Sequence, residues 1–286
     1  MTTAEPAQRA SPDWLDLRWA ADLEARDRGA AGLLEALVAH LRGSAGDDRP
    51  VRVVDVGAGT GANRRYLSAR LPFEQEWVCV DHDRELLDHP RHDGAHRIHG
   101  CLQDLPGELN ALQGAGGAPS VVVANAVLDV LTTADLAALA DCVVATGGLA
   151  LLSLSVTGQV RWEPTDPGDE LLARGFDDHQ RRGGRPGPGA PAVLTRMLQE
   201  RGLRVLSART PWDLPGPDGR HRELLERWLA ERVADAIGHD PGSGAVLRGW
   251  HARRTAQLDS DALRVLVDHV DLLILDGGTH GAQQGS

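Results

Sequence analysis

Short apolar runs alternate along most of the chain with stretches whose apolar residues recur at helical spacing. The runs rich in Val, Ile and Leu predict β-strands at 51–56, 76–81, 95–99, 120–124 and 148–155. The segments between them predict helices at 61–70, 83–88, 105–112 and 132–144. Strands that alternate with helices in this way indicate βαβ units, so we expect an α/β fold built on a parallel sheet.

Helical spacing also marks the part of the chain that precedes the first strand. Four leucines between positions 33 and 41 recur at that spacing, and residues 12–43 are predicted to form a helical lid. Pro12 directly after Ser11 favours a helix start at this point. The polar stretch 43–50 predicts a linker between the lid and the first strand.

The alternation stops after the fifth strand and resumes further along the chain. Residues 156–190 are rich in Gly and Pro, and they predict a long loop on the substrate side. Beyond it the pattern predicts a helix at 191–201, a strand at 203–208, a helical insertion at 219–258 and a last strand at 265–275. We expect one domain over 1–275, with its α/β core at 51–155 and a flexible tail at 276–286.

Composition narrows the classes of partner and of chemistry. Of the 286 residues 42% are hydrophobic, which is ordinary for a soluble globular protein, and the formal net charge is −11. This negative charge argues against nucleic acid or an anionic membrane as a partner. All 30 basic residues are arginine, so no lysine can form a Schiff base.

The cysteines and the N-terminal segment predict a compartment. Cys79, Cys101 and Cys142 are odd in number, which favours reduced thiols over a disulfide framework. No apolar leader opens the sequence, and no apolar run approaches the roughly 20 residues that span a bilayer. We therefore expect a cytoplasmic protein, whose oligomeric state the sequence does not indicate.

The sequence VRVVDVGAGTGAN at 51–63 carries the clearest chemical signal. An apolar strand ends in Asp55, and Gly57, Gly59 and Gly61 then form a tight turn before a helix. A second apolar run ends in Asp81, at the tip of the next strand, where a carboxylate suits the two hydroxyls of a ribose. This arrangement predicts a site for a nucleoside-type cofactor.

Two cofactor motifs fit the same glycine turn. Gly57-x-Gly59-x-x-Ala62 satisfies the dinucleotide fingerprint, and Gly57-x-Gly59-x-Gly61 after Asp55 fits the glycine loop of an S-adenosylmethionine site. A carboxylate at this strand end repels a pyrophosphate but attracts the ammonium and sulfonium of S-adenosylmethionine. Asp55 therefore favours S-adenosylmethionine over NAD(P).

Five motifs, the glycine turn and the Asp81 segment among them, form a family pattern. They read, in order, VVDVGAGTG, VCVDHD, HGCLQDLP, VVVANAVLDVL and ATGGLALLSLS. With them the chain resembles class I, Rossmann-like S-adenosylmethionine-dependent methyltransferases, uncharacterised bacterial members among them. The resemblance implies a doubly wound, seven-stranded, mostly parallel sheet whose last strand is antiparallel. It also implies methyl transfer to an O, N or C nucleophile of a small-molecule acceptor.

The resemblance assigns roles to the residues of the glycine turn. It implies that Asp55 receives the methionine ammonium of the cofactor and that Asp81 holds the ribose. The loop beneath the cofactor is formed by Gly57, Gly59 and Gly61, accompanied by Ala58 and Asn63. His82 matches a position that packs on adenine.

The adenine end departs from the family pattern at Cys101. The family often has an Asp there, and a thiol is a weak hydrogen-bonding group. The backbone of Leu102, or the side chain of Gln103 or Asp104, is then expected to recognise adenine.

Other candidates lie around the expected methyl-transfer point. Asn125 and Ala126 follow the fourth strand, where the family lines the methionine end of the cofactor. Asp129 follows one helical turn later, and His179 lies in the predicted loop, so both are candidate catalytic groups. Arg18, in the N-terminal helix, is a candidate clamp for the methionine carboxylate.

Three other interpretations remain open. The alternative glycine spacing allows an NAD(P)-dependent oxidoreductase. The altered Cys101 position allows a methyltransferase-like protein that binds cofactor or a partner without turnover. His92, His96 and His99 are close in sequence but lack a recognised metal-binding spacing, so no metal site is predicted.

Overall fold

The computed structural model describes residues 10–45, 49–112, 118–215 and 219–277. The helices longer than one turn are α1 (Pro12–Gly29), α2 (Ala31–Ala45), α3 (Ala62–Leu67), α4 (Arg84–Leu87), α5 (Leu105–Leu112), α6 (Thr133–Ala145), α7 (Asp169–Gln180), α8 (Ala190–Glu200), α9 (Arg222–His239) and α10 (Gly244–Asp259). The strands are β1 (Val51–Val56), β2 (Gln75–Asp81), β3 (His96–His99), β4 (Ser120–Asn125), β5 (Ala150–Glu163), β6 (Arg204–Arg209), β7 (Trp212–Leu214) and β8 (Arg264–Leu275). The predicted alternation of strands and helices is therefore confirmed.

The strands form one mixed sheet in the order β3-β2-β1-β4-β5-β8-β6, with the short β7 paired to β8. Strands β1 to β5 pair in parallel, whereas β8 runs antiparallel to its neighbours β5 and β6. The expected antiparallel last strand is confirmed. An eighth strand, β7, joins the seven expected ones in the described part of the chain.

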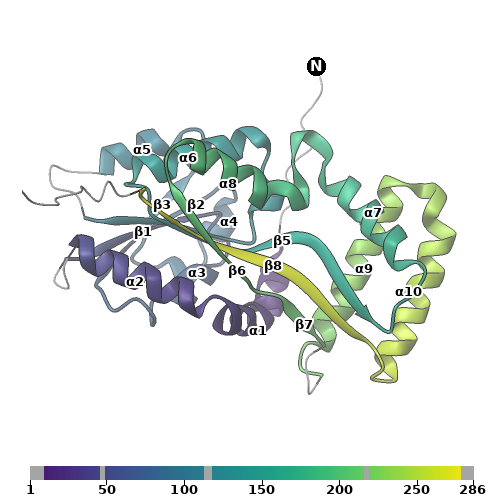
Figure 1. Cartoon of the computed structure of the whole chain (residues 1–286). Coiled ribbons are helices and arrows are strands. Elements are labelled where there is room, and N and C mark those ends of the chain that lie inside the picture. Colours follow the sequence, from purple (N-terminus) through teal and green to yellow (C-terminus); the bar gives the residue numbers. More distant parts are fainter. Residues whose placement is uncertain (1–9, 46–48, 113–117, 216–218, 278–286) are drawn as a thin grey trace, which may run out of the picture.

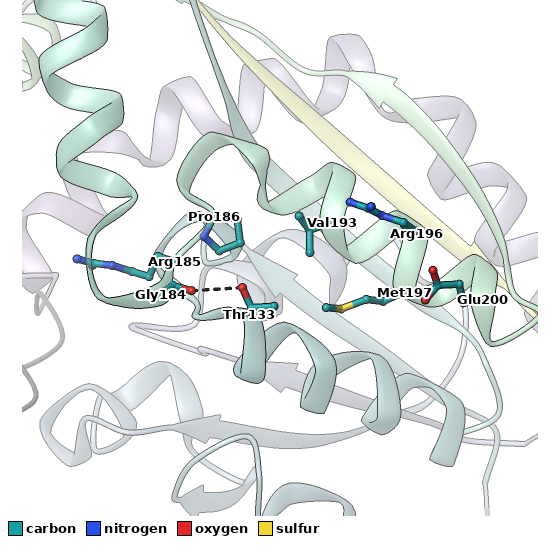
Figure 2. Close-up of a pocket in the computed structure, with 8 residues that line it drawn as sticks. All are labelled: Thr133, Gly184, Arg185, Pro186, Val193, Arg196, Met197 and Glu200. Carbon is teal, nitrogen blue, oxygen red and sulfur yellow. Dashed lines mark hydrogen bonds between the residues drawn. The ribbon is translucent and has the colours of Figure 1, made fainter.

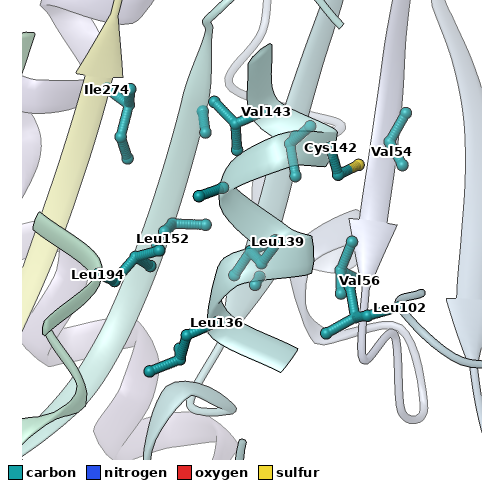
Figure 3. Close-up of a cluster of buried hydrophobic side chains, with 14 of the residues drawn as sticks. Val54, Val56, Leu102, Leu136, Leu139, Cys142, Val143, Leu152, Leu194 and Ile274 are labelled. Atoms are coloured by element: carbon teal, nitrogen blue, oxygen red, sulfur yellow. The ribbon is translucent and has the colours of Figure 1, made fainter. Parts of the chain in front are cut away.

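Helices cover both faces of the sheet, as expected for a doubly wound fold (Figure 1). Because successive side chains of a strand point to opposite faces, Val54 of β1 enters a core under α5, α6 and α8, and Val53 enters another with α2 and α3. Figure 3 shows Leu136 and Leu139 of α6 among the side chains of the first core. This double burial accounts for the largely apolar composition of the interior strands.

Strands β5 and β8 extend past the rest of the sheet and carry a helical layer of α7, α9 and α10 (Figure 1). A third hydrophobic core lies there, rich in tryptophan. The ring of Trp162 on β5 meets Trp250 of α10 edge-on at 5.1 Å and Trp228 of α9 at 5.8 Å. Helices α9 and α10 occupy the predicted helical insertion before the last strand.

Irregular pairing within β5 accompanies the curve of this extension. Between the pairs Leu152–Leu272 and Ser155–Val270, β5 contains one more residue than β8. Leu154, inside this bulge, has a φ of 54° and donates its backbone N–H to Asp271 Oδ1 at 2.8 Å. The buried Asp271 carboxylate thus supports a backbone conformation that leucine rarely adopts.

Two predictions about loops are wrong. Residues 156–190 are not one long loop, because β5 continues to Glu163 and α7 occupies Asp169–Gln180. The glycines and charged residues there lie on a half-exposed strand and on an amphipathic helix that packs on α9. The predicted linker 43–50 is partly helical, because α2 continues to Ala45.

Two further expectations concern the ends of the chain and membranes. The helical lid predicted at 12–43 is divided into α1 and α2 at Ala30. Most of the tail at 276–286 lies outside the described residues. Within the described ranges no helix has the length and apolarity that crossing a bilayer requires.

Candidate functional site

The glycine turn after β1 has its backbone amides satisfied within the protein. Gly57, Gly59 and Gly61 have φ values of 66°, 52° and 86°, a conformation that favours glycine. The N–H groups of Gly57 and Ala58 donate to the carbonyl of Val80, and that of Gly61 donates to Ala58. The Gly59 N–H donates to Asp81 Oδ2 at 2.9 Å. Four amides of the turn are therefore already bonded and would not be offered to a phosphate.

Asp81 lies at the end of β2, as predicted, and is only 6% exposed. One carboxylate oxygen accepts from Gly59 N and the other from Asp83 N, each at 2.9 Å. The exposed His82 ring brings its Nδ1 to 3.2 Å from Asp81 Oδ1. Because each carboxylate oxygen accepts more than one hydrogen bond, the oriented group can still receive a diol.

Asp55 is joined to α1 through a buried chain of polar groups. Asn63 donates its Nδ2 to Asp55 Oδ1 at 2.8 Å and accepts from Arg26 Nη1 at 3.1 Å. Arg26 and Asp55 are 2% and 1% exposed, and the guanidinium of Arg26 lies 3.7 Å above the Tyr66 ring. Asp55 Oδ2 and the Nε and Nη2 of Arg26 are buried without a hydrogen-bond partner in the described structure.

Burial determines the protonation of Asp55. Removal from water raises the pKa of the Asp55 carboxyl to about 7, although the Asn63 hydrogen bond and the charge of Arg26 act in the opposite direction. A cation bound beside Asp55 would favour the ionised carboxylate. The group can thus change charge near neutral pH when such a ligand binds.

Arg18 and Arg26 stand on one side of α1 but have different partners. The guanidinium of Arg18 forms two hydrogen bonds to Asp22, at 2.9 and 3.1 Å, and stacks on Trp212. Arg26, two helical turns further on, is the residue that reaches the glycine turn. We did not predict Arg26 from the sequence, although its spacing of eight from Arg18, with Asp22 between, is a sign of a shared helix face.

The residues expected around adenine have local partners. Cys101 is exposed and donates its thiol to Asp104 Oδ2 at 2.9 Å, while Gln103 Nε2 donates to Asp135 Oδ1 at 2.6 Å. Leu102 is nearly buried and packs into the core beneath α5 and α6. Their assignment to adenine remains a prediction.

The histidines near β3 bind backbone carbonyls. The buried His92 ring has its Nε2 2.9 Å from the Gly59 carbonyl, and His99 Nε2 is 3.1 Å from the His82 carbonyl. Burial lowers the pKa of His92, so the neutral ring donates to Gly59. Within the described ranges, no group of three or more His, Cys, Asp or Glu side chains is arranged to hold a metal.

A cavity of about 360 Å³ lies where α1, α7 and α9 meet the end of β4 and the middle parts of β5 and β8. It brings together Arg18 from α1, Ala126 and Asp129 from the segment after β4, and His179 from α7. Asn125, which precedes Ala126, has a buried Oδ1 without a hydrogen-bond partner in the described structure. Four predicted site residues, distant in sequence, thus share one cavity, which we call the helix-roofed cavity.

Asp129 and His179 differ in their surroundings. Asp129 Oδ2 accepts from Gln180 Nε2 at 2.9 Å, and burial raises the pKa of its carboxyl. The His179 Nδ1 lies 2.6 Å from Arg182 Nη2, and burial lowers the pKa of the ring. His179 is therefore held in its neutral form with Nδ1 as the acceptor.

Several residues that line the helix-roofed cavity were not predicted from the sequence to be functional. Arg232 and Trp228 come from α9, Trp212 from β7 and His269 from β8. His269 is buried, and burial together with Arg18 and Arg232 lowers the pKa of its ring to about 3, so it is neutral. The helical spacing of α9 would have indicated a shared face for Trp228, Arg232 and Asp235, but not which cavity that face lines.

A second, more open hollow lies between α6 and α8 (Figure 2). Thr133 Oγ1 donates to the Gly184 carbonyl at 3.3 Å across its edge. Arg185 borders both hollows, and in Figure 2 its side chain extends away from Val193 and Met197. The segment around Arg185 therefore separates the hollow from the helix-roofed cavity.

No family model matches the chain, and no curated protein matches it. A similar solved structure is a cyclopropane-fatty-acyl-phospholipid synthase-like protein from Lactobacillus casei, at 13% identity over 91% of this chain and 99% of that chain, with a TM-score of 0.46. YcgJ from Bacillus subtilis is similar at 16% identity over 85% of this chain and 100% of that chain, with a TM-score of 0.45. A SAM-dependent methyltransferase from Geobacter sulfurreducens, solved with S-adenosyl-L-homocysteine, is similar at 14% identity over 86% and 91%, with a TM-score of 0.40.

Proposed function

We propose that this protein is an enzyme that binds S-adenosylmethionine and transfers its methyl group to a small-molecule acceptor. One observation carries the proposal: Asp55 and Arg26, two buried groups of opposite charge bridged by Asn63, both retain polar atoms without partners. Buried polar atoms without partners are costly. An α-amino acid zwitterion would satisfy both, its ammonium on Asp55 and its carboxylate on Arg26.

The rest of the glycine turn supports the same cofactor over a dinucleotide. A pyrophosphate needs free backbone N–H groups at such a turn, and the amides of Gly57, Ala58, Gly59 and Gly61 already have acceptors. Asp81, oriented by two backbone N–H groups, suits the ribose diol common to both cofactors. The amino-acid end therefore distinguishes the two cofactors.

In the proposed reaction the main task of the protein is to position the methyl donor and the acceptor. The bound cofactor would supply a methyl group on a sulfonium, which is already a good leaving group. Asn125 is the last residue of β4, and Ala126 follows it and lines the cavity, so the acceptor would approach from the Asp129 side. Catalysis would then come mainly from positioning, and Asp129 or His179 would accept a proton from an acceptor that must lose one.

The size and enclosure of the helix-roofed cavity favour a small acceptor with an O, N or C nucleophile. Its volume of about 360 Å³ is at the low end for a small-molecule site. The net charge of −11 does not favour nucleic acid. The identity of the accepting atom is left open.

Calorimetry of the purified protein tests the proposal. We expect S-adenosylmethionine and S-adenosylhomocysteine to bind and NADH not to bind. Asp81→Ala should weaken both nucleoside ligands at least tenfold, about 1.4 kcal/mol, because the ribose loses its acceptor. Binding of NADH without S-adenosylmethionine, or an unchanged dissociation constant in a folded Asp81→Ala protein, would overturn the assignment.

A further inference from the structure

We propose that the acceptor carries a negatively charged group, a carboxylate or a phosphate, which the guanidinium of Arg232 binds together with Arg185. This inference rests on the proposed function, since it names the class of acceptor for the same site. It goes further by naming the residues that select the acceptor.

Arg232 is an unusual buried cation. It lies on α9, is 8% exposed and lines the helix-roofed cavity. Its guanidinium is held between two rings, 3.9 Å from the centre of Phe176 and 4.2 Å from that of Trp228. No carboxylate oxygen of the described residues lies within 4.0 Å of it, and its Nε is buried without a partner. Stacking between rings fixes the plane of the guanidinium and leaves its N–H groups available to a ligand.

Among the described residues, no ion pair within 4.0 Å contains Arg232 or Arg185 of the helix-roofed cavity. Arg227 pairs with Glu231 at 2.8 Å and Arg18 pairs with Asp22 at 2.9 Å. Asp235 has His179 at 4.0 Å. Of the acids that line the cavity, Asp129 is the one with no basic side chain of the described residues within 4.0 Å. Arg232 and Arg185 act on it electrostatically from further away.

Asp129 is not bonded to Arg232. It lies beyond ion-pair distance of the guanidinium, and Gln180 already donates to its Oδ2. Burial lowers the pKa of Arg232 only to about 10, so it is charged at neutral pH. Asp177, Asp129 and Asp235 stabilise the charge of Arg232 from beyond ion-pair distance, and a ligand carboxylate bonded directly to the guanidinium would stabilise it further.

Aromatic side chains surround this basic pair and give the ligand a second feature. Trp14, Phe176, Trp212 and Trp228 line the same cavity. They suit a flat or apolar body attached to the anionic group, because large rings bury apolar surface in a defined geometry. A small organic acid with an unsaturated or aromatic body meets both requirements.

The test compares four probes of similar size on protein saturated with S-adenosylhomocysteine, at constant ionic strength. The probes are 3-phenylpropionate, phenyl phosphate, neutral 3-phenylpropanamide and cationic phenethylamine. Their binding is measured by the change in tryptophan fluorescence. We expect at least a tenfold preference for one of the anions over the amide and the amine. The ratio of 3-phenylpropionate to phenyl phosphate distinguishes a carboxylate acceptor from a phosphate acceptor.

Three variants assign the preference to its residues. Arg232→Gln should abolish the anion preference, and Arg232→Lys should keep part of it, because a lysine keeps the charge without the planar fork. Arg196→Gln, the same charge change in the exposed hollow between α6 and α8, should bind the probes as wild type does. Circular dichroism and S-adenosylhomocysteine affinity confirm that each variant is folded.

The outcomes separate this inference from the proposed function. If S-adenosylhomocysteine binds but no anion is preferred, the inference is wrong and the proposed function stands. This holds if all probes bind equally, if the amine binds best or if no probe binds. If Arg232→Gln and Arg196→Gln reduce anion binding alike, the effect is one of net charge and the inference is again wrong. If S-adenosylhomocysteine itself does not bind the wild type, the proposed function is wrong.

Discussion

Arg26 and Arg18 give the site two candidate clamps for the methionine carboxylate, and single substitutions distinguish them. We expect Arg26→Gln to weaken S-adenosylhomocysteine binding at least tenfold, because Arg26 is the guanidinium beside Asp55 with free donors. Arg18→Gln should weaken it less than threefold, since Arg18 is bonded to Asp22. Calorimetry on both folded variants decides, and the reverse order would assign the clamp to Arg18.

Asp55 makes stability depend on pH in a direction opposite to that of a salt-bridged carboxylate. Its pKa rises from an ordinary value of 3.8 to about 7 in the folded protein, so between these values the folded state binds the extra proton. The contribution of Asp55 to stability therefore falls as the pH rises from about 4 to about 7 and is constant above that.

Asp55→Asn should remove this dependence. Urea unfolding of the protein without cofactor at pH 5 and pH 7.5 should show a smaller loss of stability for the variant than for the wild type. Identical losses would mean that Asp55 is not protonated in the folded protein. S-adenosylhomocysteine should bind the wild type more tightly as pH rises toward 7, because its ammonium favours the ionised carboxylate.

Helix α1 is the element on which the amino-acid end of the site depends, and its C-terminal end packs tightly on β6. A Cβ atom at Gly29 would lie 2.1 Å from the carbonyl oxygen of Arg209, closer than any contact that side chains make. Gly29→Ala should therefore displace α1 and destabilise the protein by about 1–3 kcal/mol.

Gly32 in α2 provides the matched control. A Cβ there meets nothing within 4 Å, and the residue is exposed, so Gly32→Ala should stabilise the helix by about 0.5–1 kcal/mol. Urea unfolding of both variants measures the difference. A Gly29→Ala protein as stable as Gly32→Ala would mean that α1 moves on β6 without cost.

The sequence predicts elements well where burial is complete and poorly where it is partial. Strands β1 and β4 are mostly apolar because helices cover both of their faces, and their predicted limits agree with the structure to within one residue. The outer half of β5 and helix α7 escaped prediction because each buries only one side. β7, which is three residues long, is too short to leave a periodic pattern.

The same distinction applies to the candidate site. Asp55 and Asp81 could be predicted because each lies at the end of a buried strand and next to the glycine turn in sequence or in the sheet. Arg26 and Arg232 could not, since their roles depend on how α1 and α9 dock across the strand ends. A helix pattern gives the face a residue occupies but not the cavity that this face lines.

At the scale of the whole molecule, the tryptophan core ties the helical layer to the extended strands. Trp250 is fully buried, packs edge-on against Trp162 and donates its Nε1 to Asp169 Oδ1 at 2.8 Å. Trp250→Ala should cost about 3–5 kcal/mol of stability in urea unfolding. Because Trp250 does not line the helix-roofed cavity, S-adenosylhomocysteine affinity should change less than threefold. A loss below about 1 kcal/mol would mean that the helical layer contributes little to stability.

The bulge at Leu154 makes the length of β5 matter as much as its composition. Each residue added or removed between Leu152 and Trp162 would turn every later side chain of the strand to the opposite face, taking Trp162 out of the tryptophan core and Val156 out of the helix-roofed cavity. During evolution this segment should therefore accept substitutions far more readily than single-residue gaps. Homologues that retain the cofactor residues but differ here by one residue in length would contradict this. In this protein, the number of residues along one strand determines which of its side chains enter the tryptophan core and which line the helix-roofed cavity.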